Sequence, residues 1–338
     1  MTTLLDVARL AGVTPATVSN VLRDRGRFSA RTRARVLEAV AQLQYRPHLT
    51  ARALAEGRPP TIALMVSSIA NPFYPEFALA AEHAARRDGR FLIICNTHDD
   101  PEVGQAYFDQ IAGTLSQGVL VMNSTLDADA LHRSHGARSP VVLCMWERPD
   151  RAPALPCVAV DFFLAGRLAG AHLLELGHRG IGAIVGSAPH GIHAARYEGF
   201  CQTMREAGIA TFEDNVRFTD DAIQGGHEAA QALLRANPAL TAIFATNDLP
   251  ALGAVYGALD MGRAVPDALS VIGITDIRLA RESRPALTTI AVPTVAAADL
   301  AVALLRDLIR GGDMPGDTLR VAPAPRLIQR DTTSARRP

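Results

Sequence analysis

Residues 4–57 read LLDVARLAGVTPATVSNVLRDRGRFSARTRARVLEAVAQLQYRPHLTARALAEG, and this stretch decides the fold of the N-terminal part of the chain. Thr3 and Asp6 have the spacing of a capping box, which predicts a helix that begins near Leu4. Gly12 can take the positive φ of a tight turn, so this helix should end there. We expect Leu5, Ala8 and Leu10 to form its apolar face.

A second helix should follow the turn directly. Thr14 can cap it, and Pro15 fits its first turn because the N–H that proline lacks has no partner there. Two short helices around one glycine are typical of a helix-turn-helix. If Val18, Val21 and Leu22 face inward, the outward positions are the candidate base and phosphate contacts. These are Pro15, Ala16, Thr17, Ser19, Asn20 and Arg23.

A third helix is predicted over 30–44, with Ser29 as its cap. Val36, Leu37, Val40, Ala41 and Leu43 have helical spacing and would close a three-helix core. A small amphipathic bundle used for protein contact is the alternative interpretation of this pattern.

Charge favours contact with DNA. Residues 1–60 hold ten Arg and four Asp or Glu, a net charge of +6, so the rest of the balanced chain carries −6. Such asymmetry suits a head that binds phosphates and a body that stays off the duplex.

The three segments LLDVARLAGVTPATVSNVL, SARTRARVLEAVAQLQYRP and LTARALAEG resemble the head and hinge of the lactose-repressor (LacI/GalR) family of bacterial transcription regulators. The resemblance implies that Pro15, Ala16 and Asn20 select the operator. Asn20 can read adenine through paired contacts, whereas Pro15 and Ala16 offer apolar surface to a thymine methyl. We also expect Thr3, Thr14 and Arg52 to contact DNA.

The same resemblance implies that residues 48–56 form a hinge helix only on operator DNA, with Leu54 wedged into the minor groove. A segment of this length is too short to be helical alone, yet two copies could fold together on a bent duplex. His48 stands where the family usually has Asn or Ser. Alternatively, Leu54 packs on the body.

Beyond residue 60, strands and helices alternate. Strands are predicted over 61–66, 90–96, 118–122 and 141–145, with helices over 75–88 and 102–117. After residue 161 the pattern restarts with helices over 163–176, 194–207, 225–236 and 250–261, strands over 181–185, 242–245 and 269–274, and a strand near 216. A helix over 295–310 and a strand over 319–327 end it.

This alternation predicts an all-α helix-turn-helix head followed by two doubly wound, parallel-sheet α/β lobes with a cleft between them. The expected division is a head over 1–47, a hinge helix and linker over 48–60, and an effector-binding and dimerisation core over 61–338. Lobe 1 would take about 61–160 and 292–320, and lobe 2 about 161–291 and 321–338.

The body is similar to the periplasmic-binding-protein-like core of the same family. The matching motifs, NPFY at 71–74, GHRGIG at 177–182, ARYEGF at 195–200, ATNDLPALG at 245–253 and RPALTTI at 284–290, fall in the family's order. The resemblance implies a small-molecule effector in the cleft. Its implied contacts are Asn71, Phe73, Tyr74, His190, Ile192, Arg196, Asp221, Asn247 and Thr275, with Asp248 as a further candidate whose role could also be structural.

The effector class stays open. The family commonly has G-aromatic-Asp-Asp where this chain has Gly273-Ile274-Thr275-Asp276. A hydroxyl at Thr275 in place of a charged acceptor favours an anionic or less hydroxylated ligand. The expected effector is a sugar, sugar acid or sugar phosphate, and a purine or nucleoside is the alternative.

Other classes of protein find little support. No nucleophile elbow or paired catalytic carboxylates are present, and His190 with His193 lacks a third metal ligand. We therefore expect no catalytic residues, metal or cofactor, and buried free thiols at the four cysteines. A small-molecule-binding protein or a sugar-processing enzyme is the alternative function.

Location and assembly complete the expectations. No apolar run is long enough for a signal peptide or a membrane span, so we expect a cytoplasmic protein, associated with the nucleoid when bound to DNA. After Arg330 the chain is too short for a heptad tail, which favours a homodimer on double-stranded operator DNA.

Overall fold

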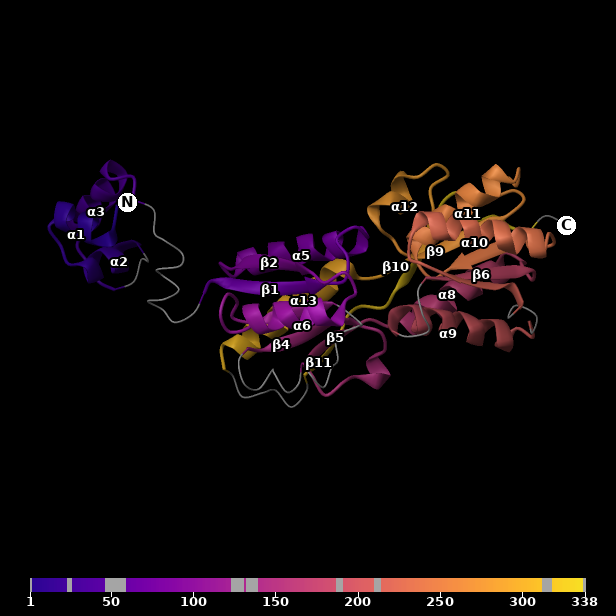
Figure 1. Cartoon of the computed structure of the whole chain (residues 1–338), viewed down its shortest axis with the longest axis horizontal. Coiled ribbons are helices and arrows are strands. Elements are labelled where there is room, and N and C mark those ends of the chain that lie inside the picture. Colours follow the sequence, from indigo (N-terminus) through magenta and orange to yellow (C-terminus); the bar gives the residue numbers. More distant parts are fainter. Residues whose placement is uncertain are drawn as a thin grey trace. The chain divides into compact units, whose positions relative to one another are not determined.

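The computed structural model describes residues 2–22, 26–45, 59–122, 131, 139–186, 191–209, 214–311 and 318–336. The chain divides into two compact units, Met1–Pro60 and Thr61–Pro338, and each is described by itself (Figure 1).

Three helices make up the described part of the first unit: α1 (Leu4–Ala11), α2 (Pro15–Leu22) and α3 (Ala30–Gln42). The capping box at Thr3 and Asp6 is confirmed, and Gly12 ends α1 with φ 61°. The Thr14 hydroxyl accepts a hydrogen bond from Thr17 N at 3.2 Å. Ser29 caps α3 by accepting from Thr32 N at 3.1 Å. The three helices begin where their capping residues predicted.

The core of this unit differs from the prediction in α1 and α3. Val7, Ala8 and Ala11 are buried with Val18, Val21, Val36 and Ala39, whereas Leu5 and Leu10 are 55% and 51% exposed. Leu37 and Ala41 are exposed as well. The buried side of α1 follows the spacing 4, 7, 8, 11, which keeps one helix face, whereas Leu5 and Leu10 point to different sides.

The first sheet of the second unit has the order β11-β5-β4-β3-β1-β2, with parallel neighbours throughout. Its strands are β1 (Thr61–Val66), β2 (Phe91–Asn96), β3 (Val119–Met122), β4 (Val141–Trp146), β5 (Cys157–Ala159) and β11 (Leu319–Val321). Its helices are α5 (Phe73–Arg87), α6 (Pro101–Ile111) and α13 (Thr294–Ile309), with a 3-10 turn at Pro149–Arg151.

Alternate residues of β1 serve opposite faces of this sheet. Ile62 and Leu64 lie in the cluster that contains the buried side chains of α5 and α13. Ala63 and Met65 lie in a second cluster with Phe108 of α6. Since side chains alternate along a strand, helices cover both faces and the strand is apolar throughout.

The second sheet has the order β12-β10-β9-β8-β6-β7, parallel except for the β10–β12 pair. The strands are β6 (Ile181–Gly186), β7 (Val216–Thr219), β8 (Ala242–Ala245), β9 (Ser270–Thr275), β10 (Thr288–Ala291) and β12 (Arg326–Ile328). The helices are α8 (Phe162–Glu175), α9 (Gly191–Glu206), α10 (Ile223–Ala236), α11 (Asp248–Asp260) and α12 (Arg278–Glu282).

The C-terminal segment differs from the single strand expected over 319–327. It forms β11 in the first sheet and β12 in the second (Figure 1). Pro323 and Pro325 lie between them, and proline cannot donate to a strand ladder, so the strand is interrupted where the chain passes from one sheet to the other. Strand β10 and the short helix α12 were not predicted.

Two smaller expectations concern buried thiols and membrane spans. Cys95, Cys144, Cys157 and Cys201 are buried and form no disulfide, as expected. Among the residues that the structure describes, no helix has both the length and the apolar character needed to cross a membrane.

Candidate functional site

The first candidate site is the outer face of α2. Pro15, Ala16 and Asn20 are exposed, and Thr17 and Ser19 are partly exposed. Thr3 and Thr14 hold the starts of α1 and α2 through their hydroxyls. Arg23, His48, Arg52 and Leu54, and with them the hinge helix, lie outside the described residues.

Arg35 of α3 fixes the turn between α1 and α2. Its guanidinium donates to Ala11 O through Nε at 3.0 Å and through Nη2, and Nη2 also donates to Gly12 O at 2.9 Å. A cation at the carbonyl end of a helix satisfies groups that have no partner within the helix. The position of α2 relative to α1 therefore depends on a contact that the helix patterns alone did not indicate.

The second candidate site lies at the carboxyl ends of strands in the second unit. Asn71 follows β1, Asp221 follows β7, Asn247 follows β8 and Thr275 ends β9, while Arg196 lies on α9. Ligands of open α/β sheets bind outside such strand ends. The structure brings all five residues into one hydrogen-bonded or electrostatically linked group.

Asp221 is the centre of this group. Its Oδ2 accepts hydrogen bonds from Asn71 Nδ2 at 2.7 Å and from Asn247 Nδ2 at 2.6 Å. Its Oδ1 is buried and has no hydrogen-bond partner among the described residues. Burial is the main reason that the pKa of Asp221 is raised to about 6, although Arg196 and the two amides oppose the shift.

Arg196 is fully buried and only partly satisfied. Nη1 donates to Thr246 O at 2.7 Å, and the guanidinium carbon stands 4.4 Å from the centre of the Phe162 ring. Nε and Nη2 have no partner in the part of the chain that the structure describes. Burial lowers the pKa of Arg196 to about 10, so it keeps its charge at neutral pH. Buried N–H groups without partners are costly, which points to a ligand that accepts hydrogen bonds here.

His193 and Thr246 belong to the site but were not predicted as members. The Thr246 hydroxyl accepts from Gly186 N at 2.9 Å and lies 3.0 Å from His193 Nδ1. Burial lowers the pKa of His193 to about 3, so its contact with Asp221 at 3.9 Å involves a neutral ring. Thr246 directly precedes Asn247 at the end of β8, and that position was the signal that could have identified it.

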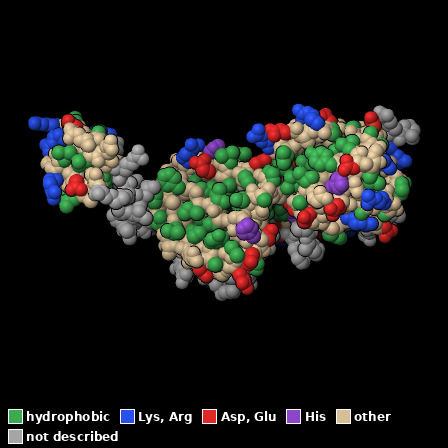
Figure 2. All heavy atoms as spheres, turned by 45° about the horizontal axis from the view of Figure 1, so that its top comes forward, with side chains coloured by type: hydrophobic (Ala, Val, Ile, Leu, Met, Phe, Trp, Pro, Cys, Tyr) green, Lys and Arg blue, Asp and Glu red, His purple; other side chains and the backbone are tan. Residues whose placement is uncertain are grey.

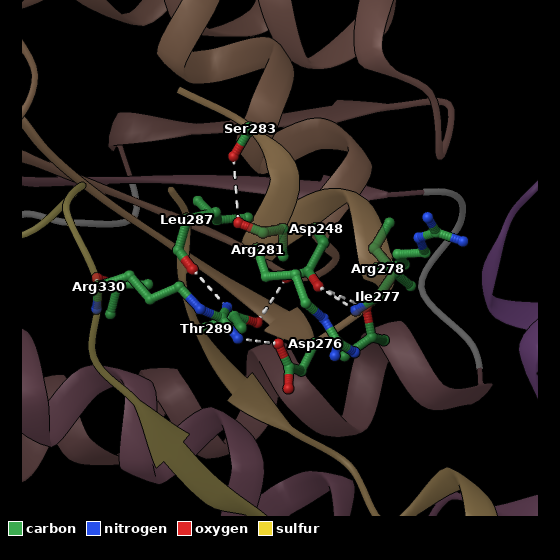
Figure 3. Close-up of polar contacts among 12 residues, drawn as sticks. Asp248, Asp276, Ile277, Arg278, Arg281, Ser283, Leu287, Thr289 and Arg330 are labelled. Carbon is green, nitrogen blue, oxygen red and sulfur yellow. Dashed lines mark hydrogen bonds and ion pairs between the residues drawn. The ribbon is translucent and has the colours of Figure 1, made fainter. Parts of the chain in front are cut away.

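Asp248 has a structural environment. Its Oδ2 accepts from Thr275 Oγ1 and from Ile277 N, both at 3.0 Å, and its Oδ1 accepts from Thr289 Oγ1 at 2.5 Å (Figure 3). Both oxygens are thus used within the protein. Thr275 is 3% exposed, and its hydroxyl donates to Asp248 and, at 3.2 Å, to Asn247 Oδ1. Its role as an effector contact stays a prediction.

The end of β9 is held in an unusual backbone conformation. Thr275 has φ 137° and Asp276 has φ 60°. Figure 3 shows Arg330 reaching between Asp276 and Leu287, with Nη2 2.6 Å from Asp276 Oδ1 and Nη1 2.8 Å from Leu287 O. Positive φ at a β-branched residue persists only where neighbours enforce it, and Asp248 and Arg330 supply that restraint.

The remaining predicted contacts are mostly packed. Phe73 is 3% exposed and meets the Tyr74 ring edge-on, with centroids 5.7 Å apart. The Tyr74 hydroxyl accepts from Ser67 at 2.6 Å, and burial raises its pKa to about 12. Ile192 packs against the core. His190 lies outside the described residues.

Known proteins resemble the chain along nearly its whole length. Residues 3–48 match the family model of bacterial regulatory proteins, lacI family, and residues 59–305 match that of periplasmic binding proteins and the sugar binding domain of the LacI family. The HTH-type transcriptional repressor PurR of Edwardsiella ictaluri (strain 93-146) is 34% identical over 331 residues, 98% of this chain and 96% of the relative.

Solved structures agree with this fold. A complex of the transcriptional regulator CelR with cellobiose is 28% identical with a TM-score of 0.71, covering 98% of this chain and 100% of the other. The lac repressor dimer bound to operator and the anti-inducer ONPF has a TM-score of 0.87 at 24% identity, with 99% of each chain covered, and supports the fold alone. With a family model over most of its length and a relative at this identity, the chain belongs to the LacI family of bacterial regulatory proteins.

Proposed function

We propose that this chain is a transcriptional repressor whose operator affinity is controlled by a small molecule bound at Asn71, Arg196, Asp221 and Asn247. The observation that carries the proposal is the buried Arg196, whose Nε and Nη2 have no hydrogen-bond partner among the described residues and whose charge influences Asp221. A structural arginine would use these groups within the protein. The relatives are repressors, and no enzyme is among those compared above.

The head is proposed to read the operator through α2. Pro15, Ala16 and Asn20 lie on its exposed side, where a recognition helix contacts base edges. We propose the division into a head over 1–47, a hinge over 48–60 and a two-lobed core over 61–338. His48, Arg52 and Leu54 are proposed hinge contacts, and the protein would act in the cytoplasm, associated with the nucleoid when bound.

The effector is proposed to be an uncharged compound with several hydroxyl groups, such as a neutral sugar. Arg196 offers donors and Asp221 offers an acceptor, and adjacent hydroxyls can satisfy both. An acidic sugar or a sugar phosphate would bring a second negative charge beside Asp221. A nucleobase is the second candidate, but Phe73 is buried and offers no open ring face for stacking.

A homodimer is proposed to form through the first lobe. Figure 2 shows apolar side chains gathered over the region of α5 and β2. Leu79 of α5 is 59% exposed, and Phe91 and Ile94 of β2 are 56% and 49% exposed. Strand β2 is also the edge of its sheet. Exposed apolar side chains at the edge of a sheet favour self-association in a regulator of palindromic sites.

The test begins with selection of the operator from random duplex DNA by the purified protein. Fluorescence anisotropy then measures operator affinity with and without neutral sugars, sugar acids, sugar phosphates and nucleobases. The Arg196→Met variant should keep its operator affinity and lose the response to the active compound, with Arg205→Met on the exposed side of the same helix as control. An intact response in Arg196→Met would refute the assigned site.

A further inference from the structure

Among the described residues, three side-chain hydrogen bonds connect the two lobes of the second unit. Arg278 N donates to Glu76 Oε1 at 2.7 Å and Arg148 Nη1 to Glu198 Oε2 at 3.2 Å, and both contacts lie at exposed positions. The third is the bond from Asn71 Nδ2 of the first lobe to Asp221 Oδ2 of the second. Exposed polar contacts contribute little because water competes for both partners. The contact at Asp221 is the only partly buried one of these three side-chain bonds, and we expect it to contribute more than the other two.

Asp221 occupies a position that suits any carboxylate. The amide nitrogens of Asn71 and Asn247 converge on one oxygen, at 2.7 and 2.6 Å, and the charged Arg196 is the main electrostatic factor that favours ionised Asp221. Two amide donors and a nearby guanidinium form the usual surroundings of a bound carboxylate. Here the carboxylate comes from the protein itself.

We propose that the Asp221 carboxylate is an internal ligand: it fills an anion position formed by the Asn71 and Asn247 amides, and it thereby holds the two lobes together before an effector binds. The proposal deepens the proposed function and rests on it, since the same residues form the effector site. An effector that bonds to Asp221 Oδ1, shares these amides or displaces the carboxylate changes the bond between the lobes.

The unsatisfied Oδ1 explains why this bond can be exchanged. A carboxylate with both oxygens fully bonded, as in Asp248, is a permanent part of its lobe. In the part of the chain that the structure describes, Asp221 Oδ1 has no partner; it lies over Gly186, where a Cβ would stand only 2.9 Å away. The Asp221 carboxylate is thus held through one oxygen only. Displacing it breaks two hydrogen bonds, whereas displacing the Asp248 carboxylate would break three.

Distances between the lobes test the proposal. All four native cysteines are buried, so single cysteines placed at the exposed positions Gln110 on α6 and Ala236 on α10 can be labelled selectively. Pulsed electron spin resonance on the full chain, diluted with unlabelled protein so that each pair lies within one chain, then reports the distance between lobes without any effector.

The Asp221→Ala variant should shift the distances to longer values and broaden their distribution. Asp220→Asn, which changes an exposed carboxylate next to it, should leave the distribution as in wild type. Sodium formate should restore the narrow distribution in Asp221→Ala, because formate can fill the vacated anion position. Should Asp221→Ala fold poorly, Asn71→Ala removes the bond from the other lobe and should give the same broadening.

Two results would overturn the proposal. The first is a wild-type distance distribution in both Asp221→Ala and Asn71→Ala. The second is a broadening in Asp221→Ala that sodium formate reverses no more than sodium chloride does. Operator binding is measured on the same samples. A protein that binds its operator but shows no broadening refutes the internal ligand alone, whereas a protein that binds no specific duplex refutes the proposed function.

Discussion

Asp248 and Asp221 are carboxylates of the same lobe, one buried and one partly buried, that differ in how fully they are bonded. Asp248 receives hydrogen bonds on both oxygens from Thr275, Ile277 and Thr289. Among the described residues, Asp221 receives them on one oxygen only. Residues with complete bonding serve the fold, and residues with an unmet bond are the ones available to a ligand.

Replacing Asp248 with Asn should destabilise the second unit by about 1–3 kcal/mol, because the amide NH₂ would face donors and leave at least one of them unsatisfied. Asp248 is fully buried, so water cannot substitute. Urea unfolding measures the loss, with Asp220→Asn as the exposed control. Equal midpoints for the two variants would show that the three donors find other partners.

The stability of wild type should depend on the ionisation of Asp221. Burial raises its pKa from 3.8 to about 6, so the folded state holds the proton more tightly than the unfolded state. The free energy of unfolding that this group contributes is present below pH 3.8 and is lost as the pH rises through about 6. The neighbouring charged or titratable groups include Arg196, His193, Tyr74 and Asp248, and the pKa of Asp248 shifts in the same direction.

The measurement is thermal unfolding from pH 4 to pH 8 for wild type and Asp221→Asn. Wild type should lose thermal stability relative to Asp221→Asn as the pH rises through about 6, since Asn does not ionise. Parallel profiles at every pH would show that Asp221 titrates normally in the folded protein.

At the scale of helices and strands, prediction succeeded where the signal was local. The first residues of α1 and α3 follow from Thr3, Asp6 and Ser29, whose side chains form hydrogen bonds with residues three positions away. The buried strands β1 and β6 were also predicted, because a strand covered on both faces is apolar throughout and can be identified from its own residues.

Prediction failed where the partner is distant. The exposure of Leu5 and Leu10 depends on which face of α1 meets α3, and the division of the last strand depends on which sheet accepts each half. The contact between Asn71 and Asp221 joins residues 150 positions apart. The residue types of the site could therefore be predicted from the sequence. Their hydrogen bonds could not, nor could the Arg196 N–H groups that have no partner among the described residues.

Helix α2 supports a prediction about base reading. Asn20 is exposed on it, and an asparagine can bond two edges of adenine at once. Asn20→Ala should relax preference at one base pair of each half-site by about 1–3 kcal/mol while nonspecific affinity is kept. Selection from random duplexes measures this, with Gln42→Ala at the exposed end of α3 as control. An unchanged base preference would remove Asn20 from the reading residues.

At the scale of the whole molecule, each chain carries one head, whereas a palindromic operator has two half-sites. Binding of the second head is intramolecular only while the two cores stay together, so the operator affinity of the assembly depends on the interface of the cores. The exposed apolar side chains of α5 and of the edge strand β2 form the proposed interface, and Ile94 lies on the α5 face of the sheet because it pairs with Leu64.

Ile94→Asp should therefore weaken the dimer and the operator complex together. A charge without a partner in an apolar interface costs more than about 1.4 kcal/mol, which corresponds to at least about a tenfold higher dissociation constant. Sedimentation velocity measures dimerisation and anisotropy measures operator binding. Leu259→Asp is the matched control, because Leu259 is 43% exposed and lies on α11, a helix of the second sheet. If Ile94→Asp stays dimeric while Leu259→Asp dissociates, the interface lies at α11, and the two heads are held together through the second sheet rather than through β2.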